Sequence, residues 1–493
     1  MAIVLGLDIG TTSTIGILID TDGQVLAQAS APTTLLAPHA GWAEEDPAEW
    51  WANTGTVCRA LLAEAGVRPE AVQAVGVAGM VPALVLLDAS GQVLRPAIQQ
   101  SDGRTGEEVA WLRTQVDEAA FLARTGNGVN QQLLAPKLRW LERHEPDVFA
   151  RIATVMGSYD FIAHRLTGVR GIERNFGLEA GFVDLATHDV ADDLVALAGV
   201  ARGVVPPLRA GHEVVGTVTP EAALHTGLAA GTRVVAGAAD HVASAFVAGV
   251  DAPGKLLIKF GGAGDVLLAT ASPRPDARLF LDYHLVPGQF MPNGCMAASG
   301  AVLNWFAREF ARDLPAPPHA ALDQAAATIA PGAEGLLLLP YFLGEKTPIH
   351  DPLARGSFVG LGLHHTRAHL WRAVLEAVCF GFRHHVDVAL ELGYPVTQVI
   401  ASDGGTSSAL WMQIAADVLG RPVQLLEGHP GSCLGAAYVA AMGVGALPDW
   451  RQMHRFVRPA SLVTPNPEAT RAYDAAYGGY RALYGALKPF FAR

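Results

Sequence analysis

The chain has 493 residues, more than one hydrophobic core supports, so two large domains are expected. Half of the residues are apolar and 17% are charged, a balance typical of a globular protein and unlike that of a disordered one. The formal net charge of -12 argues against nucleic acid or an anionic membrane as a partner, because both require a basic surface.

The sequence also sets expectations about location and redox chemistry. No stretch approaches the roughly 18 uncharged apolar residues of a membrane span, and the N-terminus starts directly with a strand-like segment. We therefore expect a cytoplasmic protein without a membrane partner. The four cysteines, Cys58, Cys295, Cys379 and Cys433, are far apart and match no metal-ligand spacing, which favours reduced thiols.

The N-terminal segment predicts three consecutive strands. Residues 2–10, 13–20 and 24–30 are rich in apolar and β-branched side chains, and Asp22-Gly23 marks a hairpin turn before the third strand. Three strands followed by helix and further strands indicate an α+β unit and not a regular βαβ series.

A helix is predicted after these strands, from Asp46-Pro47 to Gly66. The preceding acids Glu44 and Glu45 are expected, with Asp46, to form a solvated helix start. Residues 72–80 and 83–88 then predict a second hairpin.

The opening pattern returns in the middle of the chain. After a helix-rich section over residues 105–200, residues 256–270 again read as strand, glycine-rich turn and strand. A long helix follows over residues 367–393, closing at a glycine as a helix C-terminus should. We infer a duplicated architecture with its boundary near residues 246–254.

Asp8 is the first candidate for chemistry. It lies at the end of an apolar strand and is followed by the small hydroxyl residues Thr11, Thr12 and Ser13. A carboxylate in this position can hold hydrated Mg²⁺ while backbone N–H groups and hydroxyls meet phosphate oxygens. An ordinary hairpin turn is the alternative for this motif alone.

Asp240 is the second candidate, because it ends an apolar strand and begins a helical segment. A fixed carboxylate in such a place can accept the proton of a hydroxyl that attacks phosphorus. Taken alone, the residue is better explained as a helix N-cap, because Asp is among the best capping residues, and it could serve both roles.

The third candidate is the segment after residue 402. Gly404-Gly405 lets the backbone approach a ligand closely, and Thr406, Ser407 and Ser408 supply hydroxyls at a helix start. A helix N-terminus behind a glycine pair is a reasonable nucleotide seat. A glycine-rich turn with a capped helix remains the alternative.

Taken together, these motifs resemble the FGGY family of carbohydrate kinases, which belongs to the actin, hexokinase and heat-shock ATPase superfamily. The resemblance covers nearly the whole chain, and its most specific block is residues 356–376. It implies an α/β fold of two RNase H-like domains with a cleft between them. Residues 1–248 would form the N-terminal domain, with the sugar site and the base, and residues 249–493 the ATP-binding domain. It is compatible with a homodimer.

The resemblance implies ATP and Mg²⁺ as cofactors and assigns roles to the candidates. Asp8 matches the family's metal-linked carboxylate and Asp240 its catalytic base. In the second phosphate loop the family's hydroxyl residues are replaced by Gly-Gly-Ala-Gly, so backbone N–H groups must serve there, and Asp265 beside it has no explanation. The implied nucleotide-binding residues are Thr11, Thr12, Ser13, Gly261, Gly262, Gly264, Gly404, Gly405 and Ser408.

The implied sugar site departs from the family's familiar versions. Pro82 stands where xylulose kinases carry a histidine, and Gln100 and Gln132 stand where aromatic residues are usual. Asp102 is expected to stay available to a hydroxyl, and amides offer the donors and acceptors that a polyhydroxylated substrate requires. The implied substrate-binding residues are Met80, Val81, Pro82, Gln100, Asp102, Gln132, Asp240 and His241.

The sequence therefore predicts a xylulose kinase-like enzyme with a divergent sugar site. The expected acceptor is a small sugar or polyol, such as the pentuloses xylulose and ribulose or a related tetrose or pentitol. The alternatives are another ATPase of the superfamily, a non-catalytic sugar-binding relic, or a kinase of the same family acting on a non-sugar acceptor.

Overall fold

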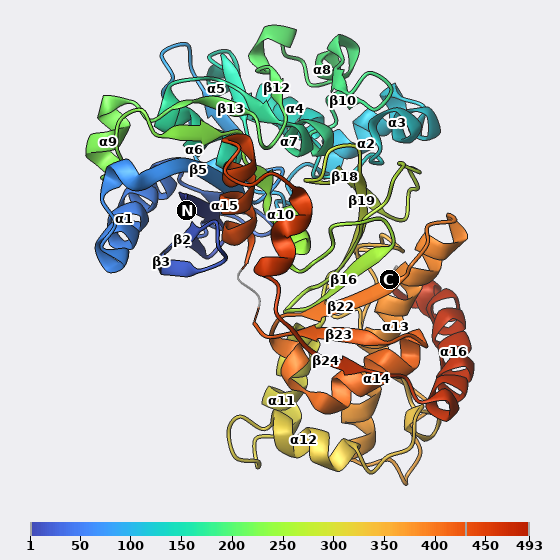
Figure 1. The fold of residues 1–493 in the computed structure, drawn as a ribbon. Helices are drawn as coiled ribbons and strands as arrows, with labels where there is room; N and C mark the ends of the chain where they lie inside the picture. Colours follow the sequence, from blue (N-terminus) through green and yellow to red (C-terminus); the bar gives the residue numbers. More distant parts are fainter. Residues whose placement is uncertain (1, 429–430, 492–493) are drawn as a thin grey trace. The chain divides into compact units, whose positions relative to one another are not determined.

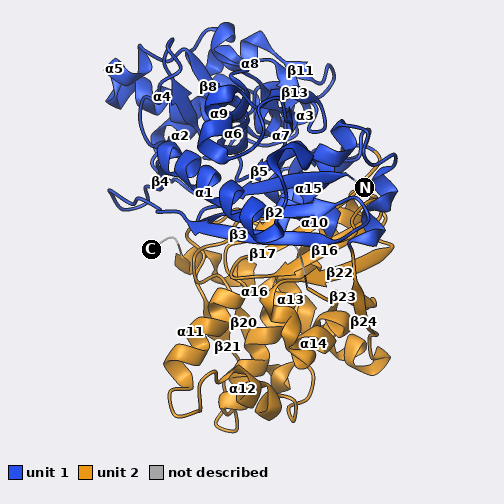
Figure 2. Cartoon of the chain, turned by 60° about the vertical axis from the view of Figure 1, so that its left-hand side comes forward, with its two compact units in different colours: residues 1–247, 272–291, 430–456 blue, residues 248–271, 292–429, 457–493 orange. Residues whose placement is uncertain are grey.

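The computed structural model describes residues 2–428 and 431–491, which divide into two compact units (Figure 2). Unit 1 comprises Met1–Val247, Ser272–Met291 and Pro430–Phe456, and unit 2 comprises Ala248–Ala271, Pro292–His429 and Val457–Arg493. The units are discontinuous in sequence. The predicted boundary between residues 248 and 249 describes only the first passage of the chain from unit 1 to unit 2. Two later segments, 272–291 and 430–456, belong to unit 1 again.

Unit 1 contains a mixed sheet that begins with the three predicted strands. β1 (Ile3–Ile9), β2 (Ser13–Asp20) and β3 (Val25–Pro32) pair antiparallel in sequence order. β5 (Val72–Gly79) then pairs parallel with β1, and β14 (Arg233–Val235) and β15 (Ala238–Ala239) pair parallel with β5. β1, β2 and β5 are largely buried and strongly apolar, as expected where helices cover both faces, whereas β3 is largely exposed.

The predicted second hairpin is wrong. β5 makes its ladders with β1, β14 and β15, while β6 (Val85–Leu87) pairs with β8 (Thr154–Met156) in a separate small sheet. The buried, continuous apolar run of β5 is typical of a central parallel strand, and such a run forms no two-residue hairpin with its successor.

The predicted first helix is present as α1 (Pro47–Ala65), with Asp46 accepting a hydrogen bond from the Ala48 N–H as N-cap and Gly66 at its C-terminus. The expectation that Glu44 and Glu45 are solvated is wrong. Glu44 and Glu45 form β4 (Glu44–Glu45) and are buried, because Glu44 pairs with Arg95 and Arg104 and Glu45 accepts a 2.8 Å hydrogen bond from the Trp50 indole.

A helix from the returning segment lies against the sheet of unit 1. α15 (Ser432–Gly443) contacts β1 and β5 (Figure 1), and it approaches them closely because glycines face it. A Cβ on Gly6 would lie 1.9 Å from the Cys433 carbonyl oxygen, and one on Gly76 would lie 2.1 Å from the Ala436 carbonyl oxygen. These two glycines therefore bring the first residue of α15 to the end of β1.

Unit 2 repeats the strand layout of unit 1. β16 (Lys255–Phe260) and β17 (Gly264–Leu268) pair antiparallel, and β17 pairs antiparallel with β19 (Phe290–Met296). β22 (Gln398–Ser402) pairs parallel with β16, as β5 does with β1, and β23 (Val423–Leu426) pairs parallel with β22. β24 (Pro459–Val463) closes this edge. The predicted repeat of the opening pattern is thus confirmed at the level of sheet topology.

The core of unit 2 is built around α13 (Arg367–Glu391), most of whose side chains are buried. The long helix was predicted to close at Gly393, which has the positive φ of 76° expected after a helix C-terminus. α14 (Ala409–Leu419) and α16 (Pro467–Phe491) pack with it.

The remaining elements complete the two units. In unit 1 they are α2 (Gly106–Gln115), α3 (Glu118–Thr125), α4 (Leu134–His144), α5 (Pro146–Phe149), α6 (Ser158–Thr167), α7 (Arg174–Glu179), α8 (Asp192–Leu197), α9 (Pro220–Thr226), α10 (Asp240–Val247), β7 (Ala97–Ile98), β9 (Ile172–Glu173), β10 (Val183–Asp184), β11 (Asp189–Val190), β12 (Leu208–Arg209), β13 (Val214–Thr217) and β18 (Phe280–Tyr283). In unit 2 they are α11 (Gly300–Phe310), α12 (His319–Ala326), β20 (Leu337–Leu339) and β21 (Ser357–Val359). Within the part of the chain that the structure describes, no helix is both long and apolar enough to cross a membrane.

Candidate active site

Three parallel strands of unit 1 end side by side and carry the predicted carboxylates. Asp8 on β1 lies opposite Ala78 on β5, and Ala239 on β15 lies opposite Gly79 on β5. Asp240 follows β15 directly and Met80 follows β5 directly, so both leave the sheet at the edge where Asp8 lies. The carboxyl edge of a parallel sheet is where ligands bind in open α/β folds.

Asp8 forms a hydrogen bond with α15, the helix that packs closely on this sheet at Gly6 and Gly76. Its Oδ2 accepts a 2.5 Å hydrogen bond from the Oγ of Ser432, the first residue of α15. The carboxylate is therefore fixed at the strand end, partly exposed, with a hydroxyl as its neighbour. A hard oxygen donor in this position suits a hydrated divalent cation such as Mg²⁺.

The turn between β1 and β2 carries the three hydroxyl residues. The Gly10 N–H donates to the Ser13 carbonyl oxygen at 3.1 Å, and the Thr12 carbonyl oxygen accepts from the Thr33 N–H at 3.0 Å. Thr11 lies beside the β5 loop, with its Oγ1 3.9 Å from the Met80 Sδ. Thr12 is exposed and Ser13 half-buried, so this short turn joins the same edge as Asp8.

Asp240 begins α10 and has 34% of its side chain exposed. Its Oδ1 accepts a 2.6 Å hydrogen bond from the His241 N–H and lies 3.3 Å from the His241 Nδ1. Its Oδ2 makes no hydrogen bond with any part of the chain that the structure describes. One oxygen is thus fixed and the other faces no protein donor.

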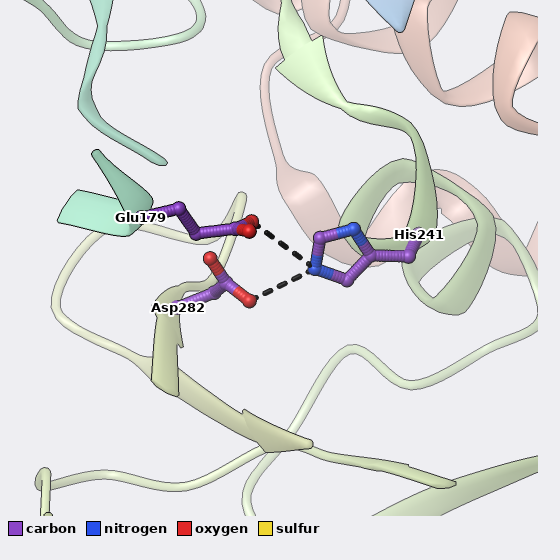
Figure 3. Close-up of side chains that lie close together, drawn as sticks. All are labelled: Glu179, His241 and Asp282. Carbon is purple, nitrogen blue, oxygen red and sulfur yellow. Dashed lines mark hydrogen bonds and ion pairs between the residues drawn. The ribbon is translucent and has the colours of Figure 1, made fainter. Parts of the chain in front are cut away.

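His241 is surrounded by carboxylates from other elements (Figure 3). Its Nε2 lies 2.8 Å from the Asp282 Oδ2, on β18, and 3.9 Å from the Glu179 Oε1, at the end of α7. Burial alone would lower the pKa of His241, but the Asp282 charge and the hydrogen bonds to Asp240 and Asp282 outweigh it and raise that pKa well above its ordinary value. The histidine was expected to touch substrate, yet both ring nitrogens lie beside protein carboxylates.

The loop after β5, residues 80–82, is buried. Its position is fixed by Lys137 on α4, whose Nζ donates to the Gln99 carbonyl oxygen at 2.9 Å and to the Pro82 carbonyl oxygen at 3.3 Å. Burial lowers the pKa of Lys137 to about 7. One amine therefore ties together two of the segments that were expected to contact the sugar.

Asp102 differs from the expectation that it is available to a hydroxyl. It has no exposed surface, and its carboxylate accepts hydrogen bonds from the Ala43 N–H at 2.7 Å and from the Arg104 guanidinium at 2.7 and 2.8 Å. Arg104 also pairs with Glu44 and stacks 3.7 Å from the ring centroid of Trp42. This network fixes the loop that follows β7 and leaves Asp102 no surface to offer a ligand.

The two predicted amides behave differently from each other. The Oε1 of Gln100 is buried and has no hydrogen-bond partner among the described residues, so it is an acceptor free for a ligand. Gln132 is half-buried, and its backbone N–H donates to the Asn130 Oδ1 at 2.7 Å. Gln99, which sequence reasoning passed over, is fully buried and has both amide atoms unpartnered in the described chain.

The glycine turn between β16 and β17 is tied to the start of α11. The Gly261 carbonyl oxygen accepts from the Gly300 N–H at 2.8 Å, and the Gly262 carbonyl oxygen accepts from the Ser299 N–H at 2.8 Å. Gly264 opens β17 in the tight space beside Phe382. This turn is the counterpart in unit 2 of the turn that holds Thr11 to Ser13.

The structure explains Asp265, the acid beside this turn. It lies directly opposite Lys259 in the β16–β17 ladder, with its Oδ2 3.7 Å from the Lys259 Nζ. The same Nζ lies 4.0 Å from the Asp403 Oδ2. The acid is therefore balanced by a neighbouring cation, a cross-strand pairing that the sequence alone does not reveal.

A cavity of about 550 Å³ opens beside this turn within unit 2. Its volume falls in the range of small-ligand sites, roughly 300–1,000 Å³. Apolar rings and backbone form much of its wall, as suits a nucleoside. It is lined by Phe260, Gly261, Gly262, Gly300, Leu303, Asn304, Pro317, His319, Ala320, Asp323, Trp371, Leu375, Gly404, Gly405, Ser407, Ser408 and Trp411.

The glycine pair is required for the shape of this wall. A Cβ on Gly405 would lie 2.4 Å from the Trp411 ring and 2.7 Å from the Phe260 Cβ, whereas one on Gly404 would meet nothing within 4 Å. Asp403 before them has a φ of 74°, which is strained for a residue with a side chain. Strain of this kind is common at ligand sites.

Ser408 caps α14 and also lines the cavity. Its Oγ accepts a 3.0 Å hydrogen bond from the Trp411 N–H and donates at 2.6 Å to the Asp323 Oδ2. Asp323 accepts a further hydrogen bond from the Trp371 indole at 2.7 Å through its Oδ1. Asp323 was missed by sequence reasoning, because nothing in its surroundings in the chain marks it as more than a helix-surface acid.

Comparison with known proteins places the chain in a family. The model for the N-terminal domain of the FGGY family of carbohydrate kinases matches residues 3–247, and the model for the C-terminal domain matches residues 256–444. The chain belongs to the FGGY family of carbohydrate kinases. The resemblance seen in its motifs is confirmed, and the protein is a sugar kinase with the two-domain α/β fold of the actin, hexokinase and heat-shock ATPase superfamily.

Several relatives of this FGGY kinase match over their whole length. A xylulose kinase of Bacillus subtilis is 31% identical over 99% of this chain and 98% of its own. An L-xylulose/3-keto-L-gulonate kinase of Escherichia coli is 30% identical over 99% and 98% of the two chains. The crystal structure of a xylulose kinase from Rhodospirillum rubrum is 56% identical, with a TM-score of 0.95 and 100% of both chains covered.

Proposed function

We propose that this FGGY kinase transfers the γ-phosphoryl group of ATP to a hydroxyl of a ketopentose, such as xylulose or ribulose, or of a related tetrose or pentitol. Asp240 is the base in this proposal. The acceptor hydroxyl gives its proton to Asp240 while its oxygen bonds to the γ-phosphorus, and the bond from that phosphorus to ADP breaks.

The observation that carries the proposal is the position of Asp240 at the carboxyl edge of β1, β5 and β15. Its Oδ1 is fixed by the His241 backbone, and its Oδ2 faces no donor in the described chain. Asp8 leaves the same edge two strands away along the β15–β5–β1 order. A base and a cation-binding carboxylate on one edge are what phosphoryl transfer to an alcohol requires.

We assign the acceptor to the loops that Lys137 ties together. The buried Oε1 of Gln100 supplies an acceptor without a protein partner, and residues 80–82 supply an apolar wall. Asp102 acts indirectly, by fixing the loop through Ala43 and Arg104. The names of the relatives support a pentulose, and the amides in place of aromatic residues support a change in hydroxyl pattern.

We assign the nucleotide to the cavity of unit 2. Gly404, Gly405 and Ser408 line it, and the Gly261-Gly262 turn offers backbone to phosphate oxygens at its edge. Mg²⁺ fits the carboxylate of Asp8, which would hold it through water, and the ion would neutralise charge on the transferred phosphate. The hydroxyls of Thr11, Thr12 and Ser13 are also suited to bind phosphate oxygens.

The proposal is tested by measuring ATP consumption with Mg²⁺ against tetroses, pentuloses, pentitols and hexuloses. At least one pentulose, tetrose or pentitol should accelerate ADP formation well above the rate without acceptor. Acceleration by none of them, or an equal rate of ATP hydrolysis with and without sugar, would indicate a superfamily ATPase or a binding relic.

The role of Asp240 is tested by Asp240→Asn with Ser244→Ala as the matched control one helical turn away. Loss of a general base costs about 10²–10⁴-fold in kcat, so the D240N variant should be nearly inactive while it still binds ATP. The S244A variant should retain turnover. Near-normal activity of D240N would overturn the base assignment.

A further inference from the structure

The environment of His241 suggests a function beyond direct contact with substrate. Its Nδ1 lies 3.3 Å from the Asp240 Oδ1. Its Nε2 lies 2.8 Å from the Asp282 Oδ2 and 3.9 Å from the Glu179 Oε1 (Figure 3). These groups come from three elements, α10, α7 and β18. β18 belongs to the segment 272–291, which the chain sends back to unit 1 from its second half.

The carboxylates of Asp240 and Asp282 determine the protonation state of the His241 ring. A neutral imidazole has one nitrogen that only accepts, and here that nitrogen would have to face a carboxylate. The charge of Asp282 and the hydrogen bonds of Asp240 and Asp282 outweigh the effect of burial and raise the pKa of His241 well above its ordinary value. Both ring nitrogens therefore carry protons, and each donates toward a carboxylate.

Burial also acts on the third carboxylate. It raises the pKa of Glu179 well above its ordinary value, and the Asp282 charge raises it further. Glu179 then closes the far side of the ring at 3.9 Å, while Asp282, only 1% exposed, supplies the counter-charge. Asp282 and Glu179 thus both flank Nε2, the ring nitrogen that does not face Asp240.

We propose that His241 is a positioning residue, whose Nδ1–H fixes the Oδ1 of Asp240 so that the Oδ2 stays free for the acceptor hydroxyl, with Asp282 and Glu179 holding the ring. This inference rests on the proposed role of Asp240 as base.

The chemistry of the step separates positioning from proton relay. The acceptor proton moves to the Oδ2 of Asp240 as the new oxygen–phosphorus bond forms. His241 does not receive that proton, because both of its nitrogens already hold one. Its contribution is to remove the rotation of the carboxylate, and misplacement of a reacting group by about 1 Å can cost about 10²-fold in rate.

The same three side chains are also close enough to suggest a metal ion. The candidate ligand atoms of Glu179, His241 and Asp282 all lie within 4.8 Å of one another. A doubly protonated imidazole has no lone pair to offer a metal, so the ion-paired arrangement and a bound metal exclude each other. Metal binding is an outcome that the experiment must distinguish.

Two amide substitutions separate the two ring nitrogens. The side-chain nitrogen of asparagine lies near the place of Nδ1, and that of glutamine lies near the place of Nε2. His241→Asn thus keeps a donor for Asp240, whereas His241→Gln keeps the donor for Asp282. We expect kcat to fall less than about 5-fold in H241N and about 10–100-fold in H241Q, with the KM for ATP unchanged in both.

Thermal stability should show the reverse order. H241N leaves the buried Asp282 without its counter-charge and should melt at the lower temperature, whereas H241Q keeps that contact. Should H241N fail to fold, the double variant H241N/D282N removes the unpaired acid and allows the same kcat comparison. A purely structural histidine would instead make H241Q the more active variant, which overturns the proposal.

The remaining outcomes distinguish this inference from the proposed function. If D240N is inactive but H241N and H241Q have equal kcat, Asp240 remains the base and the positioning role is overturned. If D240N is active, the base assignment itself fails. Zinc retained at one equivalent by the wild-type kinase after dialysis, and lost in Asp282→Asn, would show a metal site and overturn the positioning role.

Discussion

The two units have the same strand layout but different chemistry at the equivalent turns. In unit 1 the first antiparallel turn carries hydroxyl residues, and Asp8 is the penultimate residue of the strand before it. In unit 2 the turn is Gly-Gly-Ala-Gly, and the position two residues before it holds Lys259. One scaffold therefore presents a carboxylate in one unit and a cation in the other, and the side chains at the strand ends decide what each unit can bind.

The loops after the central parallel strand differ in the same way. In unit 1 the strand β5 runs into the buried segment 80–82, which forms an apolar wall. In unit 2 the strand β22 runs into Asp403, Gly404 and Gly405, and the two glycines line a cavity. We propose that this difference separates the acceptor site from the nucleotide site.

The largest loss of kcat is expected from a substitution at Asp8, which is a carboxylate where the equivalent position of unit 2 is Lys259. Asp8→Asn keeps an oxygen for the Ser432 hydroxyl but loses the charge that a cation needs. We expect kcat to fall at least about 100-fold and the Mg²⁺ requirement to rise, measured as rate against Mg²⁺ concentration.

Lys259→Met is the matched control at the equivalent position of unit 2. Lys259 lies near two acids, Asp265 and Asp403, and we expect less than about a 10-fold loss in kcat because its charge is already balanced by the protein. Equal losses in D8N and K259M would mean that the two turns are not chemically distinct.

A second contrast lies within the glycine pair of unit 2. Gly405→Ala places a Cβ 2.4 Å from Trp411, so the aromatic wall must move, whereas Gly404→Ala meets nothing within 4 Å. We expect the KM for ATP to rise about 10-fold in G405A and less than about 3-fold in G404A, with the acceptor KM unchanged in both. An acceptor defect in G405A would contradict the assignment of the cavity to the nucleotide.

The fold could be read from the sequence wherever local signals were strong. The antiparallel strands β1 to β3, the Asp46 cap and the Gly66 end of α1 are set by alternation, turn residues and capping chemistry within a few positions. The pairing of β5 was misjudged, because a continuous apolar run does not say which strand will be its neighbour. Glu45 was misjudged because its partner, Trp50, becomes adjacent only when the helix forms.

The site was predicted in part for similar reasons. Asp8, Asp240 and the Gly404-Gly405 pair stand at strand or helix ends, which leave a mark in the local sequence. Asp282 and Glu179 meet His241 only through tertiary packing across segments far apart in the chain. A buried lysine such as Lys137 could have been suspected from its place on the apolar face of a helix, but its two carbonyl partners lie on distant loops.

A substitution at Lys137 tests the acceptor site of unit 1, as the glycine substitutions test the nucleotide site of unit 2. Lys137→Met keeps the buried volume but removes both hydrogen bonds that tie the Pro82 and Gln99 backbones. We expect the acceptor KM to rise about 5-fold with the ATP KM unchanged, because the two lost hydrogen bonds, worth about 1 kcal/mol each, act on binding only through the position of the two loops. Arg139→Met, on the same helix but paired with Glu142, is the control and should leave both KM values near wild type.

The smallest effect is one of stability, and it compares a buried acid in each unit. Burial raises the pKa of Glu45 in unit 1 to about 8 and that of Glu345 in unit 2 to about 7. An unfolded glutamate has a pKa near 4.5, so the folded chain binds more protons between that value and the raised one. The stability contributed by each protonated acid is therefore complete below about pH 4.5 and is lost as pH rises through the raised pKa.

In Glu45→Gln and Glu345→Gln the substituted side chain no longer binds a proton, so its contribution to the pH dependence of stability is removed. We expect the melting temperature of the wild-type kinase to fall between pH 5 and pH 8, and each variant to fall about 2–4 °C less. Hydrogen exchange should localise the effect, to peptides of unit 1 in E45Q and of unit 2 in E345Q. If both variants protect the same peptides, the two units do not open independently, and the division of the chain into two chemically separate bodies does not extend to its stability.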